Sequence, residues 1–162
     1  MNYCAYTYLK EDSNQCDYEI MTDRLASLLG LAMHAIKHID RDELTFICEA
    51  IYHANGSIRG KNAIDDERFK KMEAIYAKYQ RPFDKFYLPL GCEGASYLHV
   101  LRSECKHIVR LIVLIEKEKT VDKRIFDLFN LLSNLFFYMA LYENEQEQFT
   151  EKEFVSLSYD IK

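Results

Sequence analysis

Two long helical patterns between Gly94 and Glu143 constrain the fold of this chain more than any other feature of its sequence. In the first pattern, apolar residues recur at alternating spacings of three and four, which is typical of one buried helix face. These residues are Leu98, Leu101, Cys105, Ile108, Ile112 and Ile115. The second pattern, residues 125–142, is apolar on nearly every side and predicts a helix surrounded by other helices or by other subunits. Helices of this kind need further helices to cover them, so the sequence predicts a helical bundle.

Each pattern also carries a line of polar residues. Beside the apolar seam of the first runs a column of cationic or protonatable side chains at i, i+3, i+7 and i+11, namely His99, Arg102, Lys106 and Arg110. The second pattern carries a stripe at i, i+3 and i+7, namely Asp127, Asn130 and Asn134. An unpaired polar group costs about 1–3 kcal/mol when it is buried, so we expect these stripes to face partners, water or a ligand. A hydrogen-bonded network that only fixes the packing is an equally good interpretation.

The rest of the chain predicts three further helices and few turns, since it holds only five glycines and two prolines. Apolar periodicity predicts helices over residues 17–39 and 40–56, the second with Asp40 as its N-cap, and a third that runs from an N-cap at Asp65 or Asp66 to Tyr79. We therefore expect an all-α protein, a five-helix antiparallel bundle.

We expect one domain over residues 1–162, with an N-terminal arm (residues 1–16) and an acidic C-terminal extension (residues 143–162) that is mobile apart from one docked turn. The loop PFDKFYLPLGCEG, which separates the third and fourth helices, contains both prolines of the chain and is too long for a simple bundle turn. Loops of this kind are often functional.

Composition argues against several classes of protein. A net charge of −5 argues against a nucleic-acid partner, although it leaves room for a local phosphate-binding pocket. Five cysteines without a C-x-x-C pair indicate a reduced, cytoplasmic protein, and we expect no signal peptide because the N-terminal residues lack a basic region followed by an apolar run. Polar residues interrupt the apolar stretch 125–142, so we interpret it as a core helix and expect no membrane span.

One Glu-x-x-His unit (Glu104 and His107) lacks the second unit that a di-iron bundle needs, and we expect no metal ligands from the protein.

Three segments, in the same order and with similar separations, resemble motifs of the ATP:cob(I)alamin adenosyltransferase family. MTDRLASLLGLA is similar to the family's V-D-E-L-N-S-x-I-G-x-A, with matches at Asp23, Leu25, Ser27, Gly30 and Ala32. FDKFYLPLGCEGASYLHVLRSECKHIVR resembles F-x-L-P-G-G followed by L-H-x-A-R and R-R-x-E-R, with matches at Phe86, Leu88, Pro89, Gly91, Leu98, His99, Arg102 and Arg110. FNLLSNLFFYMALYEN resembles L-N-R-L-S-D-L-L-F, with matches at Asn130, Leu132, Ser133, Leu135 and Phe136.

The resemblance implies a homotrimer of five-helix bundles with an active site between adjacent subunits. Family members bind ATP and a corrinoid such as cobalamin there. The reduced Co(I) attacks the 5′ carbon of ATP and expels triphosphate, a leaving group that needs fixed cations and usually Mg²⁺.

The resemblance also assigns roles to residues. Phe86 would exclude the lower axial ligand of the cobalt and keep water out, and Arg102, Lys106 and Arg110 would hold the triphosphate. Asn130 would contact the nucleotide.

Two further residues complete the expected site. Asn134 stands where the family has an aspartate, on the same stripe as Asn130, and we expect it to help bind the cofactor. Asp23 would pair with Arg110, which the apolar run that follows it predicts to be buried.

The chain departs from the family pattern on the nucleotide side. The family's T-x-T-G-D-x-G-x-T loop, which wraps ATP, has no counterpart in the glycine-free N-terminal arm. In the second basic cluster, Lys106, His107 and Val109 replace two arginines and a glutamate, and lysine is not equivalent to arginine at a bidentate site. We therefore expect a corrinoid adenosyltransferase with a rebuilt ATP site. The alternative is a non-catalytic relative that binds a corrinoid and acts as a carrier or regulator, and a bundle used only for protein interaction also stays open.

Overall fold

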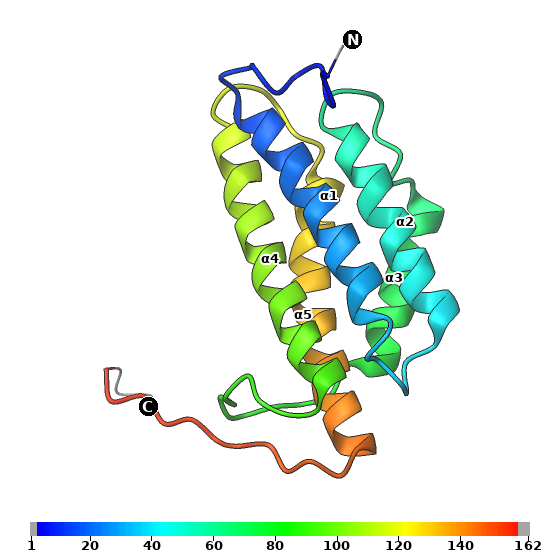
Figure 1. Ribbon diagram of the computed structural model, residues 1–162, viewed down its shortest axis with the longest axis vertical. Coiled ribbons are helices and arrows are strands. Elements are labelled where there is room, and N and C mark those ends of the chain that lie inside the picture. Colours follow the sequence, from blue (N-terminus) through cyan, green and yellow to red (C-terminus); the bar gives the residue numbers. More distant parts are fainter. Residues whose placement is uncertain (1–2, 159–162) are drawn as a thin grey trace.

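The chain folds into five helices that run alternately up and down, as the computed structural model of the protein shows for residues 3–158 (Figure 1). The helices are α1 (Asn14–Ala32), α2 (Arg41–Ser57), α3 (Asp66–Tyr79), α4 (Glu93–Ile115) and α5 (Lys123–Gln146). Within the described residues, the only β-structure is one isolated bridge between Tyr87 and Glu153. The prediction of an all-α five-helix bundle is confirmed.

Side-chain caps set the beginning of four of the helices. Asp40, the predicted N-cap of α2, accepts a hydrogen bond from the backbone N–H of Asp42. Of the two candidates for α3, Asp65 and Asp66, it is Asp65 that caps the helix, by accepting from the N–H of Arg68. Ser13 caps α1 by accepting from the N–H of Gln15, so this helix begins three residues before the predicted start at residue 17. A cap of this kind typically contributes about 1 kcal/mol to stability.

α1 ends at Ala32, whereas periodicity predicted a helix to residue 39. The reason lies in α5, where the buried carboxylate of Glu143 accepts hydrogen bonds from the backbone N–H groups of Lys37, His38 and Ile39. Those three donors are therefore used by a tertiary contact and not by the helix, so the chain turns toward α2.

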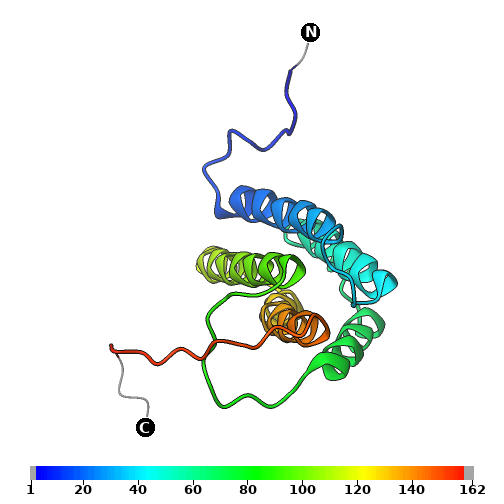
Figure 2. The same ribbon diagram turned by 60° about the horizontal axis from the view of Figure 1, so that its bottom comes forward.

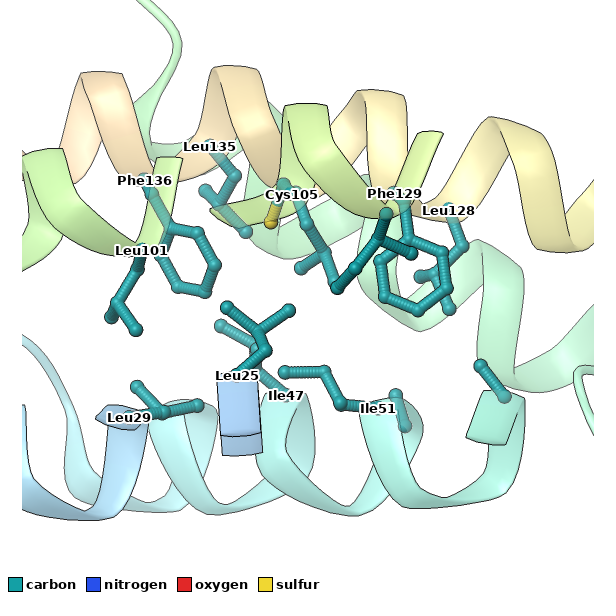
Figure 3. Close-up of a cluster of buried hydrophobic side chains, with 14 of the residues drawn as sticks. Leu25, Leu29, Ile47, Ile51, Leu101, Cys105, Leu128, Phe129, Leu135 and Phe136 are labelled. Carbon is teal, nitrogen blue, oxygen red and sulfur yellow. The ribbon is translucent and has the colours of Figure 1, made fainter. Parts of the chain in front are cut away.

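α5 lies at the centre of the bundle (Figure 2). Its most extensive packing is against α4 and it also packs against α3, while α1 packs against α4 and α2. Figure 3 shows side chains of α1, α2, α4 and α5 meeting in the core. By length and composition α5 could cross a membrane, but 61% of its most apolar window is buried inside the bundle, in line with the predicted core helix.

One side of α5 remains open in the single chain, so the four other helices do not surround it, and covering by other subunits stays a prediction. Asp127 and Asn130 are half-buried and Asn134 is exposed. The four other helices do not cover the polar stripe, which therefore faces outward.

The acidic extension also differs from its prediction. α5 continues to Gln146, and both Glu143 and Asn144 are fully buried, because their side chains bond backbone groups of other segments. The extension therefore begins about four residues later than predicted. Its described part, residues 147–158, pairs with the loop before α4 through the bridge between Tyr87 and Glu153. The last four residues of the predicted extension, 159–162, lie outside the described residues.

Candidate functional site

The two polar stripes predicted from the sequence lie on adjacent helices, on what we call the α4–α5 face: Arg102 and Lys106 of α4 with Asn130, Asn134 and Phe137 of α5. The Ser133 hydroxyl donates a hydrogen bond to the carbonyl oxygen of Arg102 at 3.3 Å, which sets the register of the two helices. Arg102 and Asn130 are half-buried, whereas Lys106 and Asn134 are exposed. The amide of Asn130 donates to the carbonyl oxygen of Phe126 at 3.0 Å.

Arg102 stands out on this face because its charge is half-buried and has no acidic partner among residues 3–158. Its Nε is buried and makes no hydrogen bond, and its guanidinium lies 5.8 Å from the ring centroid of Phe137. Burial lowers the pKa of Arg102 below its ordinary value. Arginines in such surroundings are usually paired, so this side chain is available to an anionic ligand or to a carboxylate of another subunit.

His99 lies one turn earlier on α4 and is only 5% exposed. Neither ring nitrogen has a hydrogen-bond partner among the described residues, and the ring centroid lies 6.3 Å from that of Phe137. Burial, and then the charge of Arg102, lower the pKa of His99 to about 4, so the imidazole is neutral at pH 7. The sequence placed His99 in a column of cations, and only burial reveals it as a neutral group.

Arg110 does not lie where the sequence predicted it. Its side chain is exposed, because it falls off the apolar seam that buries Leu111 and Ile112. Among the described residues of this chain, no ion pair joins it to Asp23. Asp23 is itself exposed and accepts a hydrogen bond of 2.6 Å from the hydroxyl of Tyr52.

The acid–base pair that links α1 to α4 is a different one, between Arg24 and Glu104 at 3.3 Å. The sequence did not predict this pair, and Glu104 entered only as part of a Glu-x-x-His unit. Their spacing from the apolar seams was the only available signal, and it does not identify a partner on another helix.

The loop between α3 and α4 begins beside Phe137, the aromatic residue that lies near His99 and Arg102. Phe83 packs edge-on against Phe137 and Tyr138, with ring centroids 5.1 Å and 6.1 Å apart. Phe86 follows on the same loop and is 58% exposed. The loop therefore brings an exposed aromatic side chain to the end of the bundle where His99 and Arg102 lie.

The N-terminal arm lies against α1 and α2 of its own chain. The guanidinium of Arg59 lies 4.1 Å from the ring centroid of Tyr8 and donates hydrogen bonds to Glu11 and Glu19. Ala5, Tyr6 and Leu9 of the arm line a cavity of about 410 Å³ with the exposed side chains of Asp23 and Tyr52. The described part of the predicted arm, residues 3–13, is therefore held against the bundle by these contacts, and its last three residues, 14–16, belong to α1. Residues 1–2 lie outside the described residues.

The fold and the sequence together define the class of this protein. The model of the cobalamin adenosyltransferase family matches residues 7–143, and the chain belongs to this family. The resemblance drawn from the three motifs is thereby confirmed.

A curated relative is also an adenosyltransferase. The mouse (Mus musculus) corrinoid adenosyltransferase MMAB is 25% identical, with 81% of this chain and 64% of the mouse protein covered. The chain thus spans about two thirds of the length of this relative.

Solved structures share the fold. An arginine-to-lysine variant of the PduO-type ATP:co(I)rrinoid adenosyltransferase from Lactobacillus reuteri, complexed with ATP, has a TM-score of 0.75 at 23% identity and covers 89% of both chains. A phenylalanine-to-histidine variant, complexed with cobalamin and ATP, has a TM-score of 0.75 at 20% identity and covers 95% of this chain and 97% of that one.

Proposed function

We propose that this protein transfers the 5′-deoxyadenosyl group of ATP to the Co(I) of a corrinoid such as cobalamin. Co(I) donates an electron pair to the 5′ carbon, a cobalt–carbon bond forms, and the carbon–oxygen bond breaks with its electron pair leaving on triphosphate. Membership of the cobalamin adenosyltransferase family supports this proposal. So do the corrinoid adenosyltransferase named in mouse and the structural neighbours complexed with ATP and cobalamin.

The observation that carries the proposal is the position of Arg102. It is a half-buried cation without an acidic partner in the described part of the chain, and it lies beside the ring of Phe137, which also packs against Phe83 of the loop that bears Phe86. A fixed cation in a partly dry site stabilises the charge that develops on a leaving triphosphate. In our proposal Phe86 takes the place of the lower axial ligand of cobalt and excludes water.

The exposed side chains of the site, Lys106 and Asn134, can contact a ligand that is shared with a neighbouring subunit. In the proposed homotrimer, the open side of α5 is covered by a neighbouring subunit, and Lys106, Asn130 and Asn134 face a nucleotide held between the two. Asp23 and Arg110, which are unpaired with each other within the chain, are then available to the ligand or to the neighbour.

Mg²⁺ fits this chain only as a companion of ATP. Within residues 3–158, no group of three or more His, Cys, Asp or Glu side chains could hold a metal ion. Mg²⁺ usually keeps several waters and binds substrate phosphates, so the triphosphate would supply most of its ligands here. We also place the protein in the cytoplasm, because Cys16 and Cys105 are buried thiols without a disulfide.

A non-catalytic corrinoid carrier or regulator is the second candidate, and the N-terminal arm favours it. The arm lacks glycine and is fixed to its own helices by Arg59, whereas an arm that wraps ATP must be free to close over the nucleotide.

One assay separates the two functions. The protein is mixed with ATP, Mg²⁺ and chemically reduced cobalamin, and adenosylcobalamin is followed by its visible spectrum while released triphosphate is measured. Equal amounts of both products, lost in Arg102→Ala, are expected of an adenosyltransferase. Corrinoid binding without either product would leave the carrier as the function of this protein.

A further inference from the structure

Near the end of α5, the side chain of Asn144 joins three parts of the chain. It is fully buried, and its amide nitrogen donates to the carbonyl oxygen of Leu90 at 3.0 Å and to Glu151 Oε1 at 2.8 Å. Its side-chain oxygen accepts from the backbone N–H of Cys92 at 3.0 Å. Both amide hydrogens and the carbonyl oxygen are therefore used, and the side chain is a fixed junction between α5, the loop before α4 and the C-terminal segment.

The loop approaches Asn144 so closely that only glycine fits at the point of contact. Gly91 has φ +141°, and a Cβ built there would lie 1.9 Å from the side-chain oxygen of Asn144. A residue with a side chain would be strained by this backbone conformation and would also displace the amide.

The C-terminal segment holds the same loop a second time. The N–H of Leu88 donates to the carbonyl oxygen of Lys152 at 2.9 Å, and the N–H of Phe154 donates to the carbonyl oxygen of Phe86 at 2.7 Å. Lys85 and Glu153 add an ion pair at 2.9 Å. In Figure 2 the C-terminal trace crosses the loop at the end of the bundle.

These contacts matter for Phe86 because its side chain is mostly exposed to water, so its own packing does little to hold the ring in place. The backbone contacts on either side must therefore fix where the ring lies. We propose that Asn144 is a positioning residue for Phe86: with the C-terminal segment it holds the loop so that the ring reaches the lower face of the bound corrinoid. This inference rests on the proposed function and assigns a role to Asn144 and to residues 151–154.

Three single variants of the full-length protein test the role. Asn144→Ala removes the junction, and Gly91→Ala pushes the loop away from an intact Asn144. Phe154→Pro deletes one backbone donor on the surface and leaves the buried junction in place, so it remains informative if the first two variants fold poorly. Glu143→Gln is the matched control, because Glu143 is the preceding residue and equally buried but bonds residues 37–39 instead.

The readouts are amide hydrogen exchange without ligand, ATP affinity, the visible spectrum of bound cob(II)alamin with ATP, and turnover. We expect Asn144→Ala and Gly91→Ala to exchange the amide of Cys92 faster, and Phe154→Pro to exchange the amide of Leu88 faster while that of Cys92 stays protected. All three variants should keep the ATP dissociation constant. The four-coordinate cob(II)alamin signal should fall and turnover should drop roughly 10²-fold, the loss that a misplacement of about 1 Å can cause. Glu143→Gln should lower the melting temperature but keep the spectrum.

Two failures are distinguishable. If wild type gives the four-coordinate spectrum and folded Asn144→Ala and Phe154→Pro give it equally, Asn144 has no positioning role. If wild type binds no cob(II)alamin, the proposed function itself is overturned, and the role of Asn144 with it.

Discussion

Replacing His99 by leucine should make the protein more resistant to acid. The pKa of His99 is lowered to about 4 in the folded chain, from an ordinary value of 6.5, first by burial and then by the charge of Arg102. Between these two values the unfolded chain binds a proton that the folded chain does not, so stability falls as the pH falls. Above pH 6.5 both states hold a neutral ring and the effect vanishes.

The size of the effect on stability follows from the difference between the pKa values of His99 in the unfolded and the folded chain. At pH 4.5 the imidazole is almost fully protonated in the unfolded chain but mostly neutral in the folded chain. This difference in protonation lowers the free energy of unfolding of the wild type by about 2–3 kcal/mol. His99→Leu removes that cost. At pH 7 the substitution should be neutral or mildly stabilising, because the two buried ring nitrogens that it removes have no hydrogen-bond partners.

Urea unfolding at pH 7.0 and pH 4.5 measures the effect. The free energy of unfolding of His99→Leu relative to wild type should rise by about 2–3 kcal/mol between the two pH values. His107→Gln, an exposed histidine two turns further along α4, is the control and should run parallel to wild type. If His99→Leu also runs parallel to wild type, His99 is not held as a neutral buried group and the reasoning is refuted.

Three further predictions concern assembly and the proposed site. Light scattering at micromolar concentration should give a mass near three times 19.2 kDa, since the open side of α5 needs a cover; a monomer would remove the inter-subunit site. Phe86→Ala should leave the melting temperature unchanged, because the ring is largely exposed, and abolish four-coordinate cob(II)alamin; an unchanged spectrum would make Phe86 an ordinary loop residue. Arg102→Lys should lower kcat/KM by roughly 10²–10³-fold, the usual loss when one preorganised electrostatic group is removed. The loss should exceed that of Arg110→Lys, because Arg110 is exposed; equal losses would show that burial does not make Arg102 the more important arginine.

Local sequence signals predicted most of the bundle. The apolar spacing on α4 identifies residues that are all buried, from Leu98 to Ile115, because a helix of fixed period can hide only one stripe. Asp40 and Asp65 were identifiable as caps because a capping side chain bonds an N–H only two or three residues away. The motifs also sufficed for the family, which the match over residues 7–143 confirms.

Local sequence signals gave wrong predictions wherever a segment far away in the chain determines burial or the end of a helix. Arg110 was expected to be buried from its neighbours in the chain, but exposure depends on its angle around α4 and on which helix stands opposite. α1 was expected to reach residue 39, yet Glu143 takes the backbone donors at residues 37–39. No periodicity within α1 contains that information.

The sequence by itself therefore determined which segments are helices, which faces are apolar and to which family the chain belongs, since these follow from neighbours within one or two turns. Only the tertiary structure decided which polar groups lack partners and which segments hold the loop of Phe86. Arg102 and His99 are distinguished by the absence of a partner on α5, and Asn144 by bonds to residues more than fifty positions earlier. Pairings across such distances depend on how the helices pack, because burial removes the water that would otherwise satisfy each group.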